Sequence, residues 1–267
     1  MKFHNFPVAR AALFGSLLIC LPQIAAAAEL LPQPAQLTSS LRQTAMPELG
    51  DSKVEKILSR YYNDGLGGAE NWAKLESVKL VGEVSNGGEV FELTAYLKKP
   101  NLIKLSIRRP ENQLILVRCY DGATAWRELP EQAAELMPED KARYFGHSAV
   151  FGSYLLFPYE EGKTIEFIET VPVEGEICHH LRVTLDTGYQ VHYYLDIRSF
   201  LEVKVTNTDL HNDTSNSNIY REYSHESGWP VVTHSESYEN GESVGTLRIE
   251  KISVNAGVMP WMFEMTE

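Results

Sequence analysis

From Ser77 onward, most of the chain alternates apolar and polar residues with a period of two. The clearest run is FELTAYLK, residues 91–98, in which every second residue is apolar. Side chains of a β-strand point alternately to its two faces, so this pattern predicts strands with one buried face. Asn86-Gly87-Gly88 precedes the run, and an Asn-Gly turn between two such strands indicates a β-hairpin.

The same pattern recurs along the chain between short polar connections. Lys99-Pro100-Asn101 and Asp121-Gly122 are too short for the helical crossover that parallel strands need, so the strands are expected to form an antiparallel meander. Residues 209–218 are polar and are predicted to form a mobile loop. The predicted strands cover residues 77–84, 91–98, 103–107, 113–120, a short segment around Trp126, 164–171, 177–185, 189–195, 201–206, 219–223, 231–238 and 244–254.

Only a few short helices are predicted. Asp51 or Ser52 can cap a helix whose apolar residues have helical spacing, and the glycines of residues 65–68 end it. Residues 69–75 can form a second short helix. Residues 130–144 have a helix-forming composition, with Ala133, Leu136 and Met137 on one face.

Each of these strands has one apolar face, and that face must be buried against another part of the protein. Either a large twisted sheet curls until it covers itself, or the short helices cover it from within. The predicted fold class is therefore mainly β (α+β), a single large curved antiparallel sheet that forms an open half-barrel around short helices. Incomplete coverage would leave an apolar cleft suited to a hydrophobic ligand.

Residues 145–159 are rich in apolar residues without clean alternation. They can be a plug that fills the half-barrel, or a mobile lid with Tyr154 and Tyr159 at its polar rim. Most apolar side chains belong to cores, which favours the plug.

The first 28 residues have the order of a secretory signal peptide. Lys2 and Arg10 precede the apolar residues 11–21, and the small residues 25–28 follow. Cleavage after Ala28 would leave Glu29 as the N-terminus. Cys20 resembles a lipidation site only faintly, because Ile19 stands where a small residue is usual. The domain organisation predicted is a signal peptide at 1–28, an N-terminal linker or arm at 29–50, and one domain at 51–267.

Charge and cysteine content exclude several classes of protein. Loss of Lys2 and Arg10 takes the formal charge from −12 to −14, which disfavours nucleic acid and anionic membrane surfaces as partners. No second apolar run is long enough for a transmembrane helix. Only Cys119 and Cys178 remain, so a disulfide-dense scaffold is excluded. One bridge between them is open, although the strand alternation argues against it.

A group of short motifs resembles a known family. They are the glycines before Trp72, KKPN at 98–101, YDGATAW at 120–126, HYYLD at 192–196 and VMPWMFEM at 258–265. Together with the signal peptide they resemble the bacterial outer-membrane lipoprotein-sorting-like proteins, relatives in fold of the periplasmic carrier LolA. The resemblance implies a LolA-like half-barrel with an apolar concave face that holds acyl chains in carriers, and a periplasmic location.

Motifs of catalysis and metal binding are absent from the sequence. It contains no HExxH, CxxC, phosphate-binding loop or Rossmann fingerprint, so no enzyme activity, cofactor or metal is predicted. Gly146-His147-Ser148 only approximates a nucleophile elbow, because Val150 replaces the second glycine. His179 and His180 are neighbours in a strand and point to opposite faces. His192, His225 and His234 lie in separate strands and can converge only through the fold.

The function predicted is therefore binding or carriage of an acyl chain, lipid or lipoprotein in an apolar cleft. The alternative is a non-catalytic envelope sensor or protein-interaction module, with contacts through edge strands or residues 209–218. Residues predicted to line the cleft are those with inward parity in the clearest strands and two from the lid segment: Leu80, Phe91, Leu93, Leu105, Ile107, Val117, Trp126, Phe151 and Leu155.

Overall fold

The computed structural model describes residues 49–111, 113, 115–156, 162–211 and 214–265. The predicted signal peptide, Cys20 and almost all of the predicted arm at 29–50 lie outside these residues. Phe157 and Tyr159 of the segment 145–159 also lie outside them.

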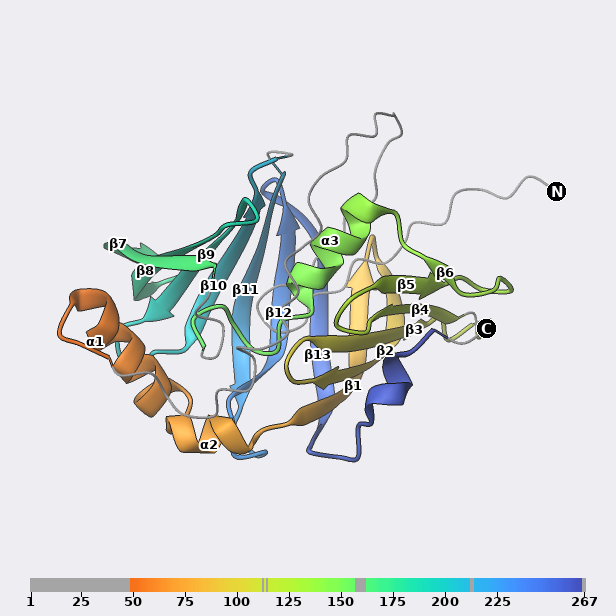
Figure 1. The fold of residues 1–267 in the computed structure, drawn as a ribbon, viewed down its shortest axis with the longest axis horizontal. Coiled ribbons are helices and arrows are strands. Elements are labelled where there is room, and N and C mark those ends of the chain that lie inside the picture. Colours follow the sequence, from red (N-terminus) through yellow and green to blue (C-terminus); the bar gives the residue numbers. More distant parts are fainter. Residues whose placement is uncertain (1–48, 112, 114, 157–161, 212–213, 266–267) are drawn as a thin grey trace.

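The described strands form one 13-stranded antiparallel sheet (Figure 1). Its order is β6-β5-β4-β3-β2-β1-β13-β12-β11-β10-β9-β8-β7. Two meanders, β1 to β6 and β7 to β13, meet where β1 pairs with β13. The strands are β1 (Ser77–Asn86), β2 (Glu89–Lys98), β3 (Leu102–Arg108), β4 (Ile115–Tyr120), β5 (Ala125–Glu128), β6 (Glu135–Leu136), β7 (Lys163–Val173), β8 (Glu176–Leu185), β9 (Tyr189–Asp196), β10 (Glu202–Asp209), β11 (Thr214–Ser224), β12 (Val231–Glu239) and β13 (Glu242–Val254).

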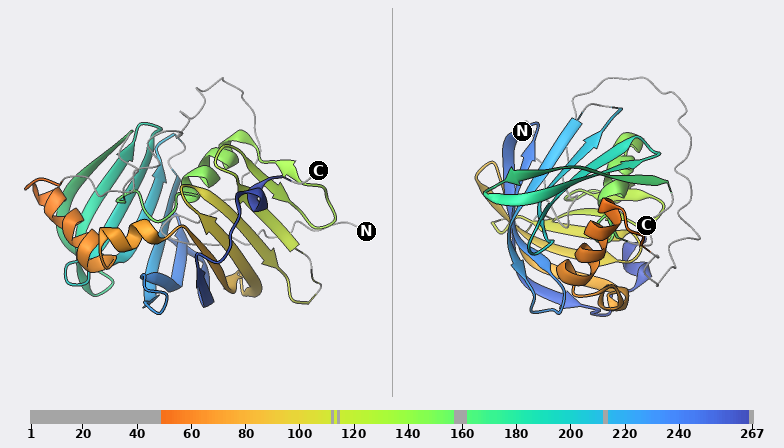
Figure 2. Two further views of the ribbon diagram at one scale, coloured as in Figure 1. Left: turned by 60° about the horizontal axis from the view of Figure 1, so that its bottom comes forward. Right: turned by 90° about the vertical axis from the view of Figure 1, so that its left-hand side faces the viewer.

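Because β6 and β7 lie at opposite ends of the order, the sheet is not closed. It curls around the three described α-helices, which lie along its concave side (Figure 2), whereas the short 3-10 helix near the C-terminus packs on its outer face. The predicted fold class, an open curved antiparallel sheet around short helices, is confirmed.

The first helix begins where the sequence predicted. Ser52 caps α1 (Lys53–Arg60), and its hydroxyl accepts from the Glu55 amide while the Glu55 carboxylate accepts from the Ser52 amide. The chain continues as η2 (Tyr61–Gly65), turns at Gly67 and Gly68, and forms α2 (Ala69–Lys74). The remaining helices are α3 (Glu139–Ser148) and η3 (Pro260–Phe263). No described helix has both the length and the apolar character needed to span a bilayer.

Two expectations about local structure were wrong. A helix was predicted over residues 130–144, but Glu135–Leu136 form an edge strand and the helix begins only at Glu139. Residues 209–218 were predicted to be a loop, but most of the segment continues β10 and begins β11, with Asp209 opposite Thr214.

The polar composition of residues 214–218 hid this part of β11, because its buried asparagines each make at least one side-chain hydrogen bond. The Asn216 amide donates to the Tyr144 hydroxyl of α3 at 2.8 Å, and Ser237 donates to Asn218 at 2.9 Å. Buried polar groups are tolerated when they have such partners.

Cys119 and Cys178 are both buried and unpaired. Each lies on the outer face of the sheet, since Cys119 is opposite Lys104 and Cys178 is opposite Asp196. They belong to the two different meanders, which the seam of β1 and β13 separates.

Candidate functional site

The concave face of β1, β2 and β3 is an apolar surface built by strand register. Leu80 lies opposite Ala95, which lies opposite Leu105, so the three form one row across the strands. Leu93 lies opposite Ile107 in a second row. These side chains are all buried, and they belong to one core cluster with residues of α1, η2 and α2. The first meander thus supplies an apolar cradle, defined as the concave face of β1 to β3.

Most of the predicted lining residues are in the cradle or above it. Leu80, Phe91, Leu93, Leu105 and Ile107 belong to the main core cluster, as do Phe151 and Leu155 from the segment after α3. Two predicted residues do not. Val117 and Trp126 pack with Cys119, Val258 and Phe263 in a second cluster.

Register explains why Val117 and Trp126 were wrongly assigned to the cleft. Val117 lies opposite Ser106, whereas Arg118 lies opposite Leu105 and therefore shares the concave face. Trp126 lies opposite Cys119 and so faces outward with it. The outer cluster is covered by η3, whose Phe263 carbonyl accepts from the Trp126 indole at 2.8 Å.

A small lid covers the lower end of the cradle. We define it as α2 together with residues 149–156. Trp72 of α2 and Phe151 pack together with ring centroids 5.6 Å apart, and both side chains are buried. Tyr154, predicted at a polar rim, is instead 6% exposed, and its amide donates to the Tyr193 hydroxyl at 2.9 Å.

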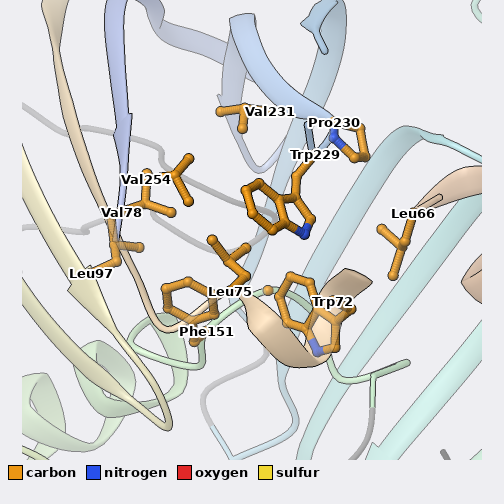
Figure 3. Close-up of a pocket in the computed structure, with 11 residues that line it drawn as sticks. Leu66, Trp72, Leu75, Val78, Leu97, Phe151, Trp229, Pro230, Val231 and Val254 are labelled. Carbon is orange, nitrogen blue, oxygen red and sulfur yellow. The ribbon is translucent and has the colours of Figure 1, made fainter. Parts of the chain in front are cut away.

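An apolar cavity lies between the lid and the sheet (Figure 3). Trp72 and Trp229 flank it, and Leu75, Leu97 and Phe151 line its interior. The cavity volume is about 20 Å³. That is room for little more than one water molecule, so an acyl chain can enter only if the lid moves.

Three side-chain hydrogen bonds to backbone carbonyls hold α2 in place. The Lys99 ammonium donates to the Trp72 carbonyl at 2.7 Å and lies 4.6 Å from the Trp72 ring centroid. The Trp229 indole donates to the Asn71 carbonyl at 3.0 Å, and the Asn71 amide donates to the Gly228 carbonyl at 2.9 Å. Burial lowers the pKa of Lys99 to about 8. No sequence motif indicates these tethers, because they join segments far apart in the chain.

A polar network holds the other part of the lid. The Tyr61 hydroxyl of η2 donates to the Glu202 carboxylate at 3.0 Å and lies 3.0 Å from the Ser153 hydroxyl. The Tyr62 hydroxyl donates to the Leu155 carbonyl at 2.7 Å. Burial raises the pKa of Glu202 to about 7, although the hydrogen bonds from Tyr61 and Ser153 oppose the shift. The lid is thus fastened to a carboxyl group that titrates near neutral pH.

Replacing Glu202 with glutamine is expected to make the protein more stable at alkaline pH. A carboxyl whose pKa is raised on folding contributes stability below its unfolded pKa of about 4.5, and that stability is lost as pH rises through about 7. Glutamine keeps the acceptor for Tyr61 without the charge. Urea denaturation at pH 8 should give a free energy of unfolding higher by about 1–3 kcal/mol for Glu202→Gln, and little difference at pH 4.

The matched control is Glu226→Gln, at an exposed residue of the β11–β12 turn. Its effect should stay within about 0.5 kcal/mol at either pH. Equal stability of Glu202→Gln and the parent protein at pH 8 would contradict a Glu202 carboxyl whose pKa is raised on folding.

The approximate nucleophile elbow has an ordinary structural role. Ser148 is the last residue of α3, where its hydroxyl donates to the Tyr144 carbonyl at 3.3 Å. A nucleophile elbow instead places serine at a sharp turn between a strand and a helix. His147 next to it stacks on Tyr189 with ring centroids 4.1 Å apart.

Comparison with solved structures identifies the fold. A LolA superfamily protein from Nitrosomonas europaea aligns with a TM-score of 0.56 at 9% identity, covering 80% of this chain and 98% of that one. A DUF1329 family protein from Desulfovibrio piger aligns with a TM-score of 0.55 at 14% identity, covering 78% and 95%. A putative outer membrane lipoprotein-sorting protein domain from Vibrio parahaemolyticus aligns with a TM-score of 0.53 at 13% identity, covering 78% and 95%.

No family model and no curated protein matches the sequence. The three structural alignments show that the chain has the LolA-like fold that its motifs suggested. Because the identities are low, the alignments establish the fold alone.

Proposed function

We propose that this protein is exported to the periplasm and binds an acyl chain of a lipid or lipoprotein in the cradle, beneath the lid, as a non-catalytic carrier. The observation that carries the proposal is the apolar cavity between Trp72 and Trp229, which continues the buried apolar rows of β1 to β3. The fold shared with a lipoprotein-sorting protein domain supports it. The signal peptide predicted from residues 1–28 supports the location.

Apolar burial can supply most of the free energy that binding needs. Each buried methylene contributes about 0.8 kcal/mol, so a chain of about 14 methylenes gains roughly 11 kcal/mol before the costs of binding. A micromolar complex needs about 8 kcal/mol. The difference, about 3 kcal/mol, is what remains to offset ordering of the ligand and displacement of the lid.

Displacement of the lid is the step that admits the ligand. Three side-chain hydrogen bonds, from Lys99, Trp229 and Asn71, hold α2 near the cavity. Net contributions of such bonds are about 1 kcal/mol each. Opening α2 therefore has a cost of the same size as the surplus available from one acyl chain.

The test is native mass spectrometry with solvent extraction on the chain from Glu29 onward, purified from periplasm without detergent. We expect lipid or acyl species to co-purify, or to bind on incubation with phospholipids and lipopeptides. Leu93→Glu should abolish binding, because it places a charge in the cradle. Thr94→Glu is the matched control, since Thr94 is the next residue of β2 and lies on the outer face, opposite Ser106.

A second readout remains informative if Leu93→Glu fails to fold. Acyl chains carrying bromine should quench the fluorescence of Trp72 and Trp229, which line the cavity. The double variant Trp72→Phe/Trp229→Phe should lose most of that quenching, because Trp126 and Trp261 lie elsewhere. An unchanged apo mass after incubation with lipids would reject the carrier function.

A second candidate is the interaction module, and the cavity volume favours it. At about 20 Å³ the cavity is nearly filled by side chains, as expected of a domain that binds protein rather than lipid. Strand β7 lies at one end of the sheet and offers an edge for an added strand. Absence of lipid binding, together with capture of an extended peptide at β7, would favour this candidate.

A further inference from the structure

Two histidines that the sequence keeps apart meet on the outer face of the second meander. His180 of β8 lies opposite Tyr194, and His192 of β9 lies opposite Arg182, so the two histidines are diagonal neighbours on one face. His180 Nε2 and His192 Nδ1 are hydrogen-bonded to each other at 2.8 Å. Tyr194 stacks on the His180 ring at 4.4 Å with an interplanar angle of 18°, which fixes the orientation of that ring.

The nitrogen of His192 that faces away is held by an acceptor. Gln190 uses its amide nitrogen to donate to the Thr184 hydroxyl at 3.1 Å, which leaves its Oε1 facing His192 Nε2 at 3.2 Å. An amide oxygen can only accept, so His192 carries its proton on Nε2. Its Nδ1, which faces His180, is then a lone pair.

The second ring nitrogen of His180, Nδ1, also lies near an acceptor but makes no hydrogen bond to it. His180 Nδ1 is buried and has no hydrogen-bond partner, and it lies 3.8 Å from Glu169 Oε1. Because His192 Nδ1 accepts, His180 Nε2 donates in the metal-free pair. Transfer of that proton to Nδ1, where it would face the Glu169 carboxylate, would free a second inward lone pair. Two inward lone pairs with acceptors behind both rings are the arrangement that metal-binding histidines have.

We propose that His180 Nε2 and His192 Nδ1 chelate a late first-row divalent cation, with Cu²⁺ as the best fit. Cis ligands of a square-planar ion with bonds of about 2.0–2.1 Å stand about 2.9 Å apart, whereas tetrahedral zinc would need about 3.3 Å. The observed 2.8 Å fits the square arrangement. Glu169 and Gln190 orient the two ligands.

One positive charge lies close to the pair and is neutralised by an ion pair. The nearby Arg182 is paired with Glu166 at 2.8 Å, which reduces its repulsion of a cation.

The site has two protein ligands. Among the described residues, no group of three or more histidine, cysteine, aspartate or glutamate side chains could hold a metal. The remaining positions of a square ion would be taken by water or by an outside ligand. Because the pair lies on the outer face, it is independent of the cradle and of the carrier proposal.

The experiment uses the untagged chain from Glu29 onward, freed of metal and titrated with Cu²⁺ by calorimetry in a buffer with a weak competing chelator. We expect one equivalent to bind, with an electron paramagnetic resonance spectrum that shows coupling to two imidazole nitrogens. His180→Gln and His192→Gln should each raise the Kd for that equivalent at least about 100-fold, and Glu169→Gln about 10-fold. His225→Gln, at an exposed turn, is the matched control and should leave it unchanged.

Two results would overturn the site. One is a parent protein that binds no more Cu²⁺ than the double variant His180→Gln/His192→Gln, with circular dichroism showing that both are folded. The other is Zn²⁺ binding tighter than Cu²⁺, which would contradict the square geometry.

Discussion

Gly82→Ala is expected to lower the free energy of unfolding by roughly 3 kcal/mol or more, a large effect for one added methyl group. Gly82 lies in β1 at the seam where the two meanders join. A Cβ on Gly82 would stand 2.1 Å from the Arg248 carbonyl oxygen and 2.8 Å from the Ile249 Cα. These are backbone atoms of β13, so they cannot rotate aside.

Because the seam joins the two meanders, we expect the destabilisation by Gly82→Ala to affect the whole sheet. The pairing of β1 with β13 is the connection between the two halves of the sheet order, and its register shifts between Val81 and Gly82. A second glycine of the seam, Gly245, has the same constraint, because its Cβ would stand 2.1 Å from the Ser85 carbonyl oxygen. If β1 and β13 were pushed apart at Gly82, the hydrogen bonds between these strands would weaken on both sides of that residue.

Urea denaturation followed by circular dichroism measures the effect. The control is Gly87→Ala in the β1–β2 turn, where a Cβ meets no atom within 4 Å but φ is +58°. That variant carries only the strain of the left-handed conformation, about 1 kcal/mol. A Gly82→Ala protein no less stable than Gly87→Ala would show that the seam has room for a side chain.

The second large effect is expected for Phe263→Ala, at about 3–5 kcal/mol of destabilisation. Phe263 is fully buried in the outer cluster with Val117, Cys119 and Trp126. Its carbonyl accepts from the Trp126 indole at 2.8 Å and from the Cys119 thiol at 3.2 Å. Loss of the ring leaves a cavity beneath η3 and loosens the carbonyl that satisfies the buried indole.

The same variant tests where Val117 and Trp126 belong. Under the carrier proposal, Phe263→Ala should leave the acyl-chain Kd within about twofold at temperatures where the protein is folded, because the outer cluster lies across the sheet from the cradle. Trp261→Ala, on the same turn but 66% exposed, is the stability control and should cost well under about 1 kcal/mol. If Phe263→Ala lost ligand binding while its fold stayed intact, Val117 and Trp126 would have to be part of the binding site.

Local signals were sufficient for most of the strands and for the first helix. The alternation in residues 91–98 predicts β2 because a half-buried strand needs one apolar face, and that requirement is written in consecutive residues. Asp51 or Ser52 predicts the start of α1 because a cap residue satisfies backbone amides within one turn, and in the structure Ser52 is the cap, in a capping box with Glu55. The short turns predict antiparallel pairing because no crossover fits into them.

Predictions failed where distant residues decide the outcome. Residues 214–218 look like a loop until Tyr144 and Ser237 supply partners for their buried amides. Leu136 looks like part of a helix face, yet it pairs across from Trp126 in an edge strand. In both cases the partner lies in another element, which local composition does not reveal.

The sequence by itself determined that this protein is a curved antiparallel sheet with a buried face, because side-chain alternation is a property of each strand alone. The tertiary structure decided which face each strand buries, since the face depends on register against a neighbour, and register placed Arg118 inward and Val117 outward. It also decided the lid tethers at Lys99 and Trp229 and the meeting of His180 with His192. Those contacts join residues of different elements, and only the folded chain fixes the distances between them.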